Sequence, residues 1–340
     1  MSKKNSNVIL KEGFKNYEEL FYIYSSFKKK LNLFKKKTFL IAVSGGPDSL
    51  ALTALAKAYS YDKKCKIYYV LVDHNLRKNS SHEARSVKTL LQKYKITLNV
   101  LKNKKLIKNN IQSEARRIRY NLLTSFCKKK KIKTILTAHN LEDQVETFFI
   151  RLSRGSGLQG LSSMKEINKI NDNIHLVRPL LDFKKIQLIK ISKVIFGKFY
   201  RDPTNKNTKY LRTRIRNLKK SLETSGINYD QVFQSIKNLA SSRDTLDLYF
   251  NQIYKDAINN RKNKILISFK SLSNLNQEMK MRVLQKSIKD LTNAYYSPRS
   301  KKIFNLINQI KEKKNAKLTL GGCIILREKN HIILKKERKN

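Results

Sequence analysis

Residues 38–49 read TFLIAVSGGPDS, and the rest of the chain is organised around this stretch. Residues 39–43 form a short apolar run, which predicts a fully buried strand. A Gly-Gly turn follows, and apolar residues then recur at helical spacing over residues 52–59. A strand, a glycine turn and a helix N-terminus together present free backbone N–H groups to an anion, and the helix dipole favours negative charge there. The stretch therefore predicts a phosphate-binding loop.

The loop lacks the Walker pattern G-x-x-x-x-G-K-S/T but reads S-G-G-x-D-S, which resembles the PP-loop of ATP pyrophosphatases. Enzymes of that group transfer AMP to a substrate oxygen and release pyrophosphate. A carboxylate beside a bound phosphate needs a cation between them, usually Mg²⁺, so we predict Asp48 as a metal ligand and catalytic residue. The residues predicted to bind ATP here are Ser44, Gly45, Gly46, Pro47, Asp48 and Ser49. A glycine turn that binds nothing is the structural alternative.

The charge of the chain favours a polyanionic partner. Among 340 residues, 74 are Lys or Arg and 25 are Asp or Glu, which gives a formal net charge of +49. Lysine outnumbers arginine, and Asn and Ile are frequent, so a compositional bias explains part of this charge; the remainder favours RNA or DNA. The three cysteines lie far apart, which predicts neither a zinc site nor a redox pair and favours a reducing, cytoplasmic location. No apolar run is long enough to predict a membrane span.

Strands that alternate with helices predict an α/β fold with a doubly wound, mostly parallel sheet. From about residue 225 the alternation stops, and a smaller, mainly helical region with a terminal β-hairpin follows. We expect three parts: a leader and basic helix at 1–37, a PP-loop ATP-binding catalytic domain at 38–222, and a basic domain at 223–340. The expected strands are residues 39–43, 67–72, 96–101, 132–138 and 174–181, and the expected helices between them are residues 83–94, 113–127 and 143–153.

Polar residues follow two of the predicted strands, and in parallel sheets the ligand lies beyond the carboxyl ends of the strands. Asp73 and His74 follow the second strand, whose end usually faces the nucleoside, so we predict that both contact ATP. An ordinary polar strand end is the alternative. His139 follows the fourth strand, and a lone histidine there more often makes a capping hydrogen bond than acts in catalysis.

Glu142, Asp143 and Glu146 place three carboxylates in one helical turn of a strongly basic chain. Their i,i+3 and i,i+4 spacing puts them on one face, where like charges are unfavourable unless a cation or an ammonium group lies among them. At the rim of the phosphate loop, this cluster favours Mg²⁺ or an amine substrate. Acidic residues that stabilise a helix dipole are the structural alternative.

Two basic segments offer contacts to phosphate groups. Arg116 and Arg119 share one face of the helix predicted at 113–127, which favours neutralisation of ATP or RNA phosphates. A second basic run lies beside Tyr210 near the predicted domain junction and is the better candidate for binding RNA. Its members predicted to bind RNA are Arg212, Arg214 and Arg216. A solvated basic face is the alternative.

Together these motifs resemble one family, the tRNA(Ile)-lysidine synthetases. The resemblance extends over residues 38–218, in the order expected for the family. The family usually has a second His and an Asp where this chain has Asn140 and Glu142. Beyond the 44–49 loop, the resemblance rests on V-D-H at 72–74 with Leu76 and Arg77, A-R at 115–116 with R-Y at 119–120, residues 139–147, R-L-S-R-G-S-G at 151–157 with G-L at 160–161, R-P-L-L at 178–181, D-P-T-N at 202–205 and R-N at 216–217.

The resemblance implies a two-step reaction on the wobble cytidine of the isoleucine tRNA with a CAU anticodon. ATP adenylates the C2 oxygen with loss of pyrophosphate, and the amine of L-lysine then displaces AMP to give lysidine, which changes the codon read from AUG to AUA. The resemblance further implies that Asp143 and Glu146 bind lysine and act in catalysis, that Arg116 is catalytic, and that Arg119 binds substrate. The basic C-terminal domain would grip the tRNA.

Two alternatives stay open. A tRNA thiolase or another RNA-adenylating PP-loop enzyme is the nearest rival, although many thiolases need paired cysteines and this chain has none close together. A non-catalytic, basic RNA-binding protein leaves the carboxylates and the PP-loop unexplained. The sequence is compatible with a homodimer.

Overall fold

The computed structural model describes residues 14, 16–34, 38–76, 79–104, 107, 111–171, 173–200, 207–261, 264–292, 294, 297–313 and 315–337. Three sequence expectations lie outside the described residues: the leader before residue 14, Arg77, and the turn at 202–205. The chain divides into two compact units, Met1–Leu239 and Ala240–Asn340.

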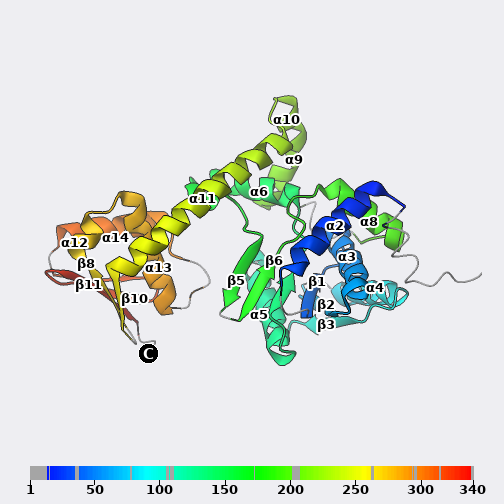
Figure 1. Ribbon diagram of the computed structural model, residues 1–340, viewed down its shortest axis with the longest axis horizontal. Helices are drawn as coiled ribbons and strands as arrows, with labels where there is room; N and C mark the ends of the chain where they lie inside the picture. Colours follow the sequence, from blue (N-terminus) through cyan, green and yellow to red (C-terminus); the bar gives the residue numbers. More distant parts are fainter. Residues whose placement is uncertain are drawn as a thin grey trace, which may run out of the picture. The chain divides into compact units, whose positions relative to one another are not determined.

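The first unit is built on a six-stranded sheet, which confirms the predicted α/β fold (Figure 1). Its strands are β1 Thr38–Val43, β2 Lys66–Asp73, β3 Leu98–Lys102, β4 Thr134–Leu136, β5 Ile167–Asn171 and β6 Ile174–Val177. Their order is β3-β2-β1-β4-β6-β5. Strands β3, β2, β1, β4 and β6 are parallel, and β1 lies between β2 and β4. Strand β5 forms one edge of the sheet and is antiparallel to β6. The phosphate loop therefore leaves the sheet from an interior strand.

Helices cover both faces of this sheet because its central strands are apolar on both sides. Phe39 and Ile41 of β1 belong to a core shared with α2, α3, α4 and α8, whereas Leu40 packs on the other face against Leu123 of α5. The helices of this unit are α2 Glu18–Asn32, α3 Pro47–Lys63, α4 Ser80–Gln92, α5 Ile111–Lys129, α6 Leu141–Leu152, α7 Leu158–Leu161, α8 Lys185–Phe196, α9 Leu211–Asn217, α10 Lys219–Thr224 and the start of α11 Tyr229–Ala257.

The second unit combines helices with a five-stranded antiparallel sheet in the order β7-β8-β11-β10-β9. Its further elements are β7 Ile258–Arg261, β8 Lys264–Ser268, α12 Phe269–Ser273, α13 Gln277–Thr292, α14 Ser300–Glu312, β9 Ala316–Leu320, β10 Cys323–Arg327 and β11 His331–Lys336. Leu284 of α13 and Ile303 of α14 are fully buried against sheet residues such as Ile325. This unit therefore has a hydrophobic core of its own.

The two units divide within α11, after Leu239. Tyr229, Phe233 and Ile236 of α11 pack with Leu141 and Val145 of α6, so the first turns of α11 belong to the first unit. The boundary predicted at 222–223 lies earlier in the chain, before α11 begins. The change from alternating strands to helices at residue 225 is therefore not where the packing of the first unit ends.

Several elements differ in detail from the sequence expectations. α5 begins at Ile111, two residues before the expected start at residue 113. In the basic helix α2, the buried stripe consists of Leu20, Ile23, Tyr24, Phe27 and Leu31, whereas Tyr22 is 66% exposed. Helix α8 and the strands β5, β7 and β8 were not predicted from the sequence. These strands lie at or next to sheet edges, where short and partly polar segments give a weak strand pattern.

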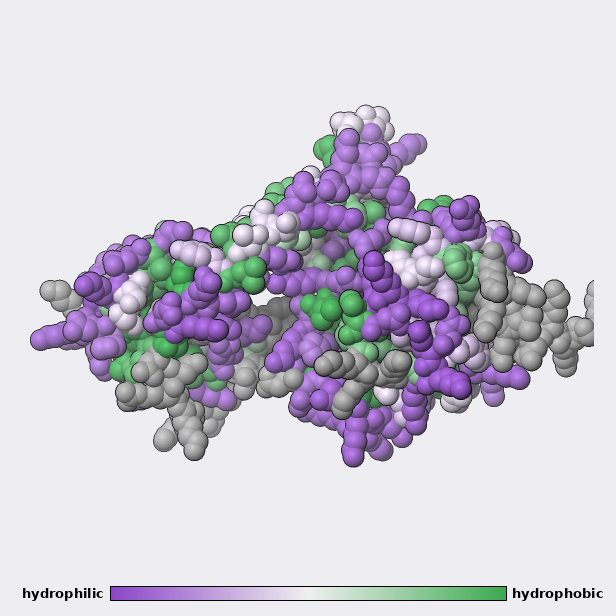
Figure 2. Space-filling view, viewed as in Figure 1, coloured by the Kyte–Doolittle hydropathy of each residue, from purple (hydrophilic) through white to green (hydrophobic). Residues whose placement is uncertain are grey.

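The visible surface of the protein is mostly hydrophilic (Figure 2). This distribution follows from a composition in which 29% of the residues are charged. None of the helices in the described ranges is long and apolar enough to cross a membrane.

Candidate active site

The 44–49 loop joins β1 to α3 at the carboxyl end of β1. Gly45 has a φ of +83°, a left-handed conformation that favours glycine. A Cβ atom at this position would lie 2.5 Å from Val87 Cγ2 of α4, so even alanine does not fit without a shift. Pro47 is the first residue of α3, where its missing N–H leaves no helical bond unmade. The loop thus has the tight glycine turn that the sequence predicts.

The two loop serines bond to each other. Ser49 Oγ accepts a hydrogen bond from the Ser44 N–H at 3.1 Å and from the Ser44 hydroxyl at 3.0 Å. In turn, the Ser49 hydroxyl donates to the Gly46 carbonyl at 3.0 Å. Because Ser49 is buried and Ser44 is exposed, Ser44 is the better placed of the two to meet a phosphate.

Asp48 lies in the first turn of α3, and its Oδ1 is buried without a hydrogen-bond partner among the described residues. Burial raises the pKa of Asp48 to about 6. The positive charge of Lys185 and a hydrogen bond from Asn140 oppose this rise in the pKa, whereas the negative charge of Asp143 adds to it. Asp48 and the acidic start of α6 therefore lie at one site. An unpartnered carboxylate oxygen close to other carboxylates suits a hard divalent cation such as Mg²⁺.

The acidic start of α6 is held in place by a capping box. Asn140 Oδ1 accepts the Asp143 N–H at 2.9 Å, and Asp143 Oδ2 accepts the Asn140 N–H at 3.2 Å. Glu142 Oε2 accepts the N–H of Lys185, the first residue of α8, at 2.8 Å. The two positions that depart from the family pattern thus have structural functions: Asn140 caps α6, and Glu142 ties α6 to α8.

Guanidinium groups from α9 lie among the carboxylates of α6. Arg216 Nε and Nη2 donate to the two oxygens of Glu146 at 2.7 and 3.0 Å, which raises the pKa of Arg216. Arg212 Nε donates to Glu146 Oε2 at 2.8 Å, and its Nη2 lies 3.2 Å from Asp143 Oδ1. Glu146 is only 2% exposed, so these ion pairs balance a buried charge. The cations among these carboxylates are thus arginines of the chain itself, and a site here for Mg²⁺ or an amine substrate stays a prediction.

The basic run of α9 is therefore not one RNA-facing surface. Arg212 and Arg216 are four residues apart and turn toward α6, whereas Arg214 donates to the carbonyls of Thr208 and Lys209, each at 3.4 Å. The prediction that all three arginines contact RNA needs correction on this point, because helical spacing sends alternate positions to different faces.

His139, which follows β4, lies close to arginines of α5. Burial and nearby arginines hold its pKa well below the usual range; Arg178 has the largest effect among these charges, followed by Arg212, Arg116 and Arg119. Arg116 also lies over the Tyr120 ring, 5.0 Å from its centroid. The imidazole is therefore neutral at pH 7, and the predicted residues Arg116 and Arg119 contribute to a positive field around it.

The Asp73 carboxylate accepts hydrogen bonds from the residues that follow β2. Its Oδ1 accepts the Asn75 N–H at 2.9 Å and its Oδ2 accepts the Ser81 hydroxyl at 2.8 Å. These bonds outweigh burial and lower the pKa of Asp73. This geometry matches the structural alternative for the side chain more closely than the predicted ATP contact.

His74 keeps a ring nitrogen available. Burial, with a smaller effect of the Arg119 charge, lowers the pKa of His74 to about 4, and its Nε2 accepts a bond from Arg119 Nε at 3.4 Å. Its buried Nδ1 has no partner in the described part of the chain. His74 therefore remains suited to a polar ligand group.

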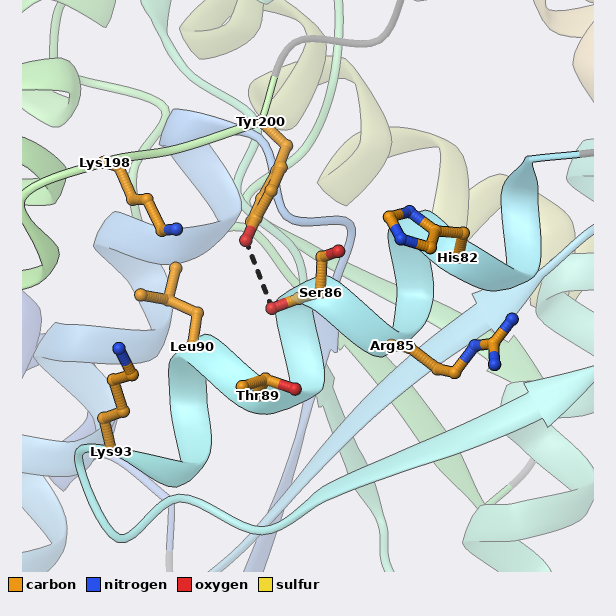
Figure 3. Close-up of a pocket in the computed structure, with 8 residues that line it drawn as sticks. All are labelled: His82, Arg85, Ser86, Thr89, Leu90, Lys93, Lys198 and Tyr200. Carbon is orange, nitrogen blue, oxygen red and sulfur yellow. Dashed lines mark hydrogen bonds between the residues drawn. The ribbon is translucent and has the colours of Figure 1, made fainter.

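A basic pocket of about 390 Å³ lies outside the predicted site residues (Figure 3). Arg85 and Lys93 of α4 and Lys198 line it, and Tyr200 stands between this pocket and the phosphate loop. The Tyr200 hydroxyl donates to the Ser86 carbonyl at 3.1 Å, and its N–H donates to the Gly45 carbonyl at 3.0 Å. No carboxylate lines the pocket among the described residues, so its chemistry suits an anion.

Three residues of this region were not predicted. Lys185 and Tyr200 carry no motif of their own, and the tertiary fold brings both to the loop. Arg178 begins the R-P-L-L segment on which the resemblance rests, which could have placed it at the site, and it acts here on His139.

Comparisons with known proteins agree on a family. A PP-loop domain family matches residues 21–222. A tRNA(Ile)-lysidine synthase of Wolbachia pipientis wMel is 34% identical over 304 residues, which cover 87% of this chain and 70% of that relative. One of Rickettsia bellii (strain OSU 85-389) is 30% identical, with 93% of this chain and 74% of the relative covered.

A solved structure shares the fold at low sequence identity. The U34-tRNA thiolase NcsA from Methanococcus maripaludis is 16% identical, with a TM-score of 0.55 over 66% of this chain and 79% of that chain. This likeness concerns the fold, whereas the relatives at 30–34% identity share the sequence over most of the chain.

Proposed function

This chain belongs to the tRNA(Ile)-lysidine synthase family, and from that premise we propose that it ligates L-lysine to C2 of the wobble cytidine in the isoleucine tRNA with a CAU anticodon. It is an ATP-using PP-loop enzyme. The observation that carries the proposal is a cluster of carboxylates at the 44–49 loop: Asp143 lies close to Asp48 of the loop, and Arg212 joins Asp143 to Glu146. A loop for pyrophosphate and a carboxylate site for an ammonium group are what the two steps require.

In the first step the C2 oxygen of cytidine attacks the α-phosphorus of ATP, and pyrophosphate leaves. The N–H groups at the start of α3 and the Ser44 hydroxyl would bind the phosphates. Mg²⁺ would bind at Asp48, where it would offset the charge of the departing pyrophosphate. The unpartnered Oδ1 of Asp48 fits this role.

The arginines around His139 would orient the α-phosphate and stabilise the charge that develops on it. Arg116 and Arg119 are the predicted members of this group, and both lower the pKa of His139. Since burial and these arginines keep His139 neutral, its imidazole adds no further charge and can serve as a hydrogen-bond partner.

In the second step an amine of lysine attacks C2, a proton leaves the nitrogen, and AMP departs with the C2 oxygen. A lysine side-chain amine has a reference pKa of about 10.4, so it needs a group that accepts its proton. Asp143 and Glu146 would hold the ammonium and bring it toward the adenylated base. Asp143 lies close enough to Asp48 to raise its pKa, and Arg212 joins Asp143 to Glu146, which supports a single site for both steps.

Binding of the tRNA needs contacts to phosphates outside the catalytic cluster. The basic pocket lined by Arg85, Lys93 and Lys198 lies one side chain away from the 44–49 loop and suits the RNA backbone near the target base. We assign the second unit to gripping the tRNA body, and the pairing of two copies stays a prediction.

A thiolase is less well supported by the cysteines. Cys127 and Cys323 are buried, and burial raises the pKa of Cys127 to about 12, so that this thiol stays protonated. The described residues also hold no cluster of three or more metal-binding side chains of the kind that an iron–sulfur or zinc site needs.

The test is pyrophosphate release from ATP with Mg²⁺ and a CAU-anticodon isoleucine tRNA transcript, with and without L-lysine. We expect release that depends on the tRNA, followed by lysine on the RNA. Release without lysine incorporation would keep adenylation and reject lysine as the nucleophile. No release with any tRNA would reject the proposed activity.

A further inference from the structure

The two arginines of α9 hold the carboxylates of α6 in different ways. Arg216 directs both of its donors to the two oxygens of Glu146, at 2.7 and 3.0 Å, which is the fork-to-fork geometry of a strong ion pair. Arg212 instead makes one contact to each of two carboxylates, at 2.8 Å to Glu146 and 3.2 Å to Asp143. The Arg212 side chain is 38% exposed. Arg216 therefore clamps one carboxylate, whereas Arg212 bridges two from the solvent side.

The charge balance makes Arg212 the replaceable member. Glu146 is buried and keeps a full counter-charge from Arg216 when Arg212 leaves. Asp143 keeps its capping-box bonds with Asn140, and its side chain is partly exposed. A second cation at this place is thus favourable, but nothing in the local geometry requires it to be a guanidinium group. A primary ammonium carries the same charge and three donors on a smaller head.

We infer that Arg212 occupies the cation site that the ammonium of lysine takes during turnover, so that Arg212 must leave its bridge between Asp143 and Glu146 before lysine binds. The inference rests on the proposed function, because it takes lysine as the nucleophile. Arg212 is then a positioning residue: it keeps the carboxylates paired and apart from other cations until substrate arrives.

Anions at the site favour this exchange. The charges of Arg212, Arg116 and Arg119 all lower the pKa of His139. The Arg212 guanidinium therefore lies near the arginines that would bind the ATP phosphates. A phosphate there attracts Arg212 away from the carboxylates, which vacates the site for an ammonium group. Linkage then requires that a nucleotide strengthens lysine binding and that lysine strengthens nucleotide binding by the same factor.

The experiment measures lysine binding to the full chain by titration calorimetry, without tRNA, in the wild type, Arg212→Gln and Arg214→Gln. Arg214 is a matched control because it lies on the same short helix, carries the same charge and bonds to backbone carbonyls instead of carboxylates. We expect Arg212→Gln to lower the Kd for lysine about fivefold or more, because a competing cation is gone. Arg214→Gln should stay within about twofold of wild type.

A second series repeats the titrations with a non-hydrolysable ATP analogue and Mg²⁺. We expect the analogue to lower the Kd for lysine in the wild type and to have little further effect in Arg212→Gln. A merely structural Arg212 would leave this coupling unchanged. If Arg212→Gln fails to fold, Arg212→Met keeps the aliphatic stem and tests the same loss of charge.

The outcomes separate the inference from the proposed function. An equal or higher Kd for lysine in Arg212→Gln, in a protein whose wild type forms lysidine, overturns the inference alone. A wild type that forms no lysidine overturns the proposed function and the inference together. A lower Kd with loss of the nucleotide coupling supports both.

Discussion

Replacing Asp48 by Asn should stabilise the metal-free protein at pH 8 while it abolishes activity. Burial and neighbouring carboxylates raise the pKa of Asp48 from 3.8 to about 6. The folded state therefore holds the Asp48 proton more tightly than the unfolded chain does, and the charged form is a destabilising element. The amide of Asn has nearly the same shape and carries no charge, so the substitution removes this penalty.

The pKa difference sets the size of the effect. Each unit of difference between the folded-state and unfolded-state pKa corresponds to about 1.4 kcal/mol. The difference for Asp48 therefore gives at most about 3 kcal/mol in the free energy of unfolding. Below pH 3.8 the carboxyl is protonated in both states, and the substitution has no effect through its charge. Between the two pKa values the penalty grows, reaching about half at pH 5, and above pH 6 it is fully present.

The assay is hydrogen exchange by mass spectrometry in increasing urea, with EDTA, read on peptides from β1 and α3. These peptides report on the first unit alone. Asp230→Asn serves as control, because Asp230 is exposed and pairs with Lys184 at the surface; we expect a change of less than about 1 kcal/mol there. The reasoning would be refuted if Asp48→Asn left the stability of the first unit unchanged or lowered it at pH 8. A stabilisation of the same size at every pH would refute it as well.

Gly45→Ala should destabilise the first unit by about 2–4 kcal/mol, because the new Cβ meets Val87 and the backbone is left-handed; Gly155→Ala, which has a similar φ of +64° and no atom within 4 Å, should cost about 1 kcal/mol in a thermal or urea melt. A combined charge reversal of Arg85, Lys93 and Lys198 should weaken tRNA binding and reduce the slope of log K against log salt by about 0.7–0.9 for each phosphate that the protein no longer neutralises. The same reversal at Lys128 and Lys129, the last residues of α5, and at Lys130 just after it should change this slope less. Equal effects would exclude the pocket as a specific RNA-binding surface. Glu146→Gln should lower the stability of the first unit by about 2–3 kcal/mol, since it leaves two arginines without their shared counter-charge, whereas Glu223→Gln at an exposed i,i+4 pair should change it by less than about 0.5 kcal/mol in the same melt.

Much of the fold was predictable because its signals are local. The apolar run at 39–43 and the Gly-Gly turn specify a buried strand and a tight loop within a dozen residues, and β1, the loop and α3 follow this expectation. The alternation of strands and helices up to residue 153 has the same local origin. The missed strands β5, β7 and β8 are short segments whose pairing partners, not their own patterns, make them strands.

The site was predictable in its residue types but not in its pairing. The spacing of Glu142, Asp143 and Glu146 along one helix shows that a cation must lie among them, because three like charges on one face repel.

Chain order and strand periodicity are enough to bring a phosphate loop and a carboxylate cluster together at the carboxyl ends of parallel strands, since they decide which residues stand there. The cation that fills the cluster is instead selected by the packing of the folded chain. Arg212 lies 66 residues from Glu146 along the chain, and the packing of α9 on α6 sets that contact. The sequence around Arg212, which reaches the buried Glu146, does not differ in pattern from the sequence around Arg214, which is exposed. The two arginines differ because one face of α9 packs against α6 and the other does not.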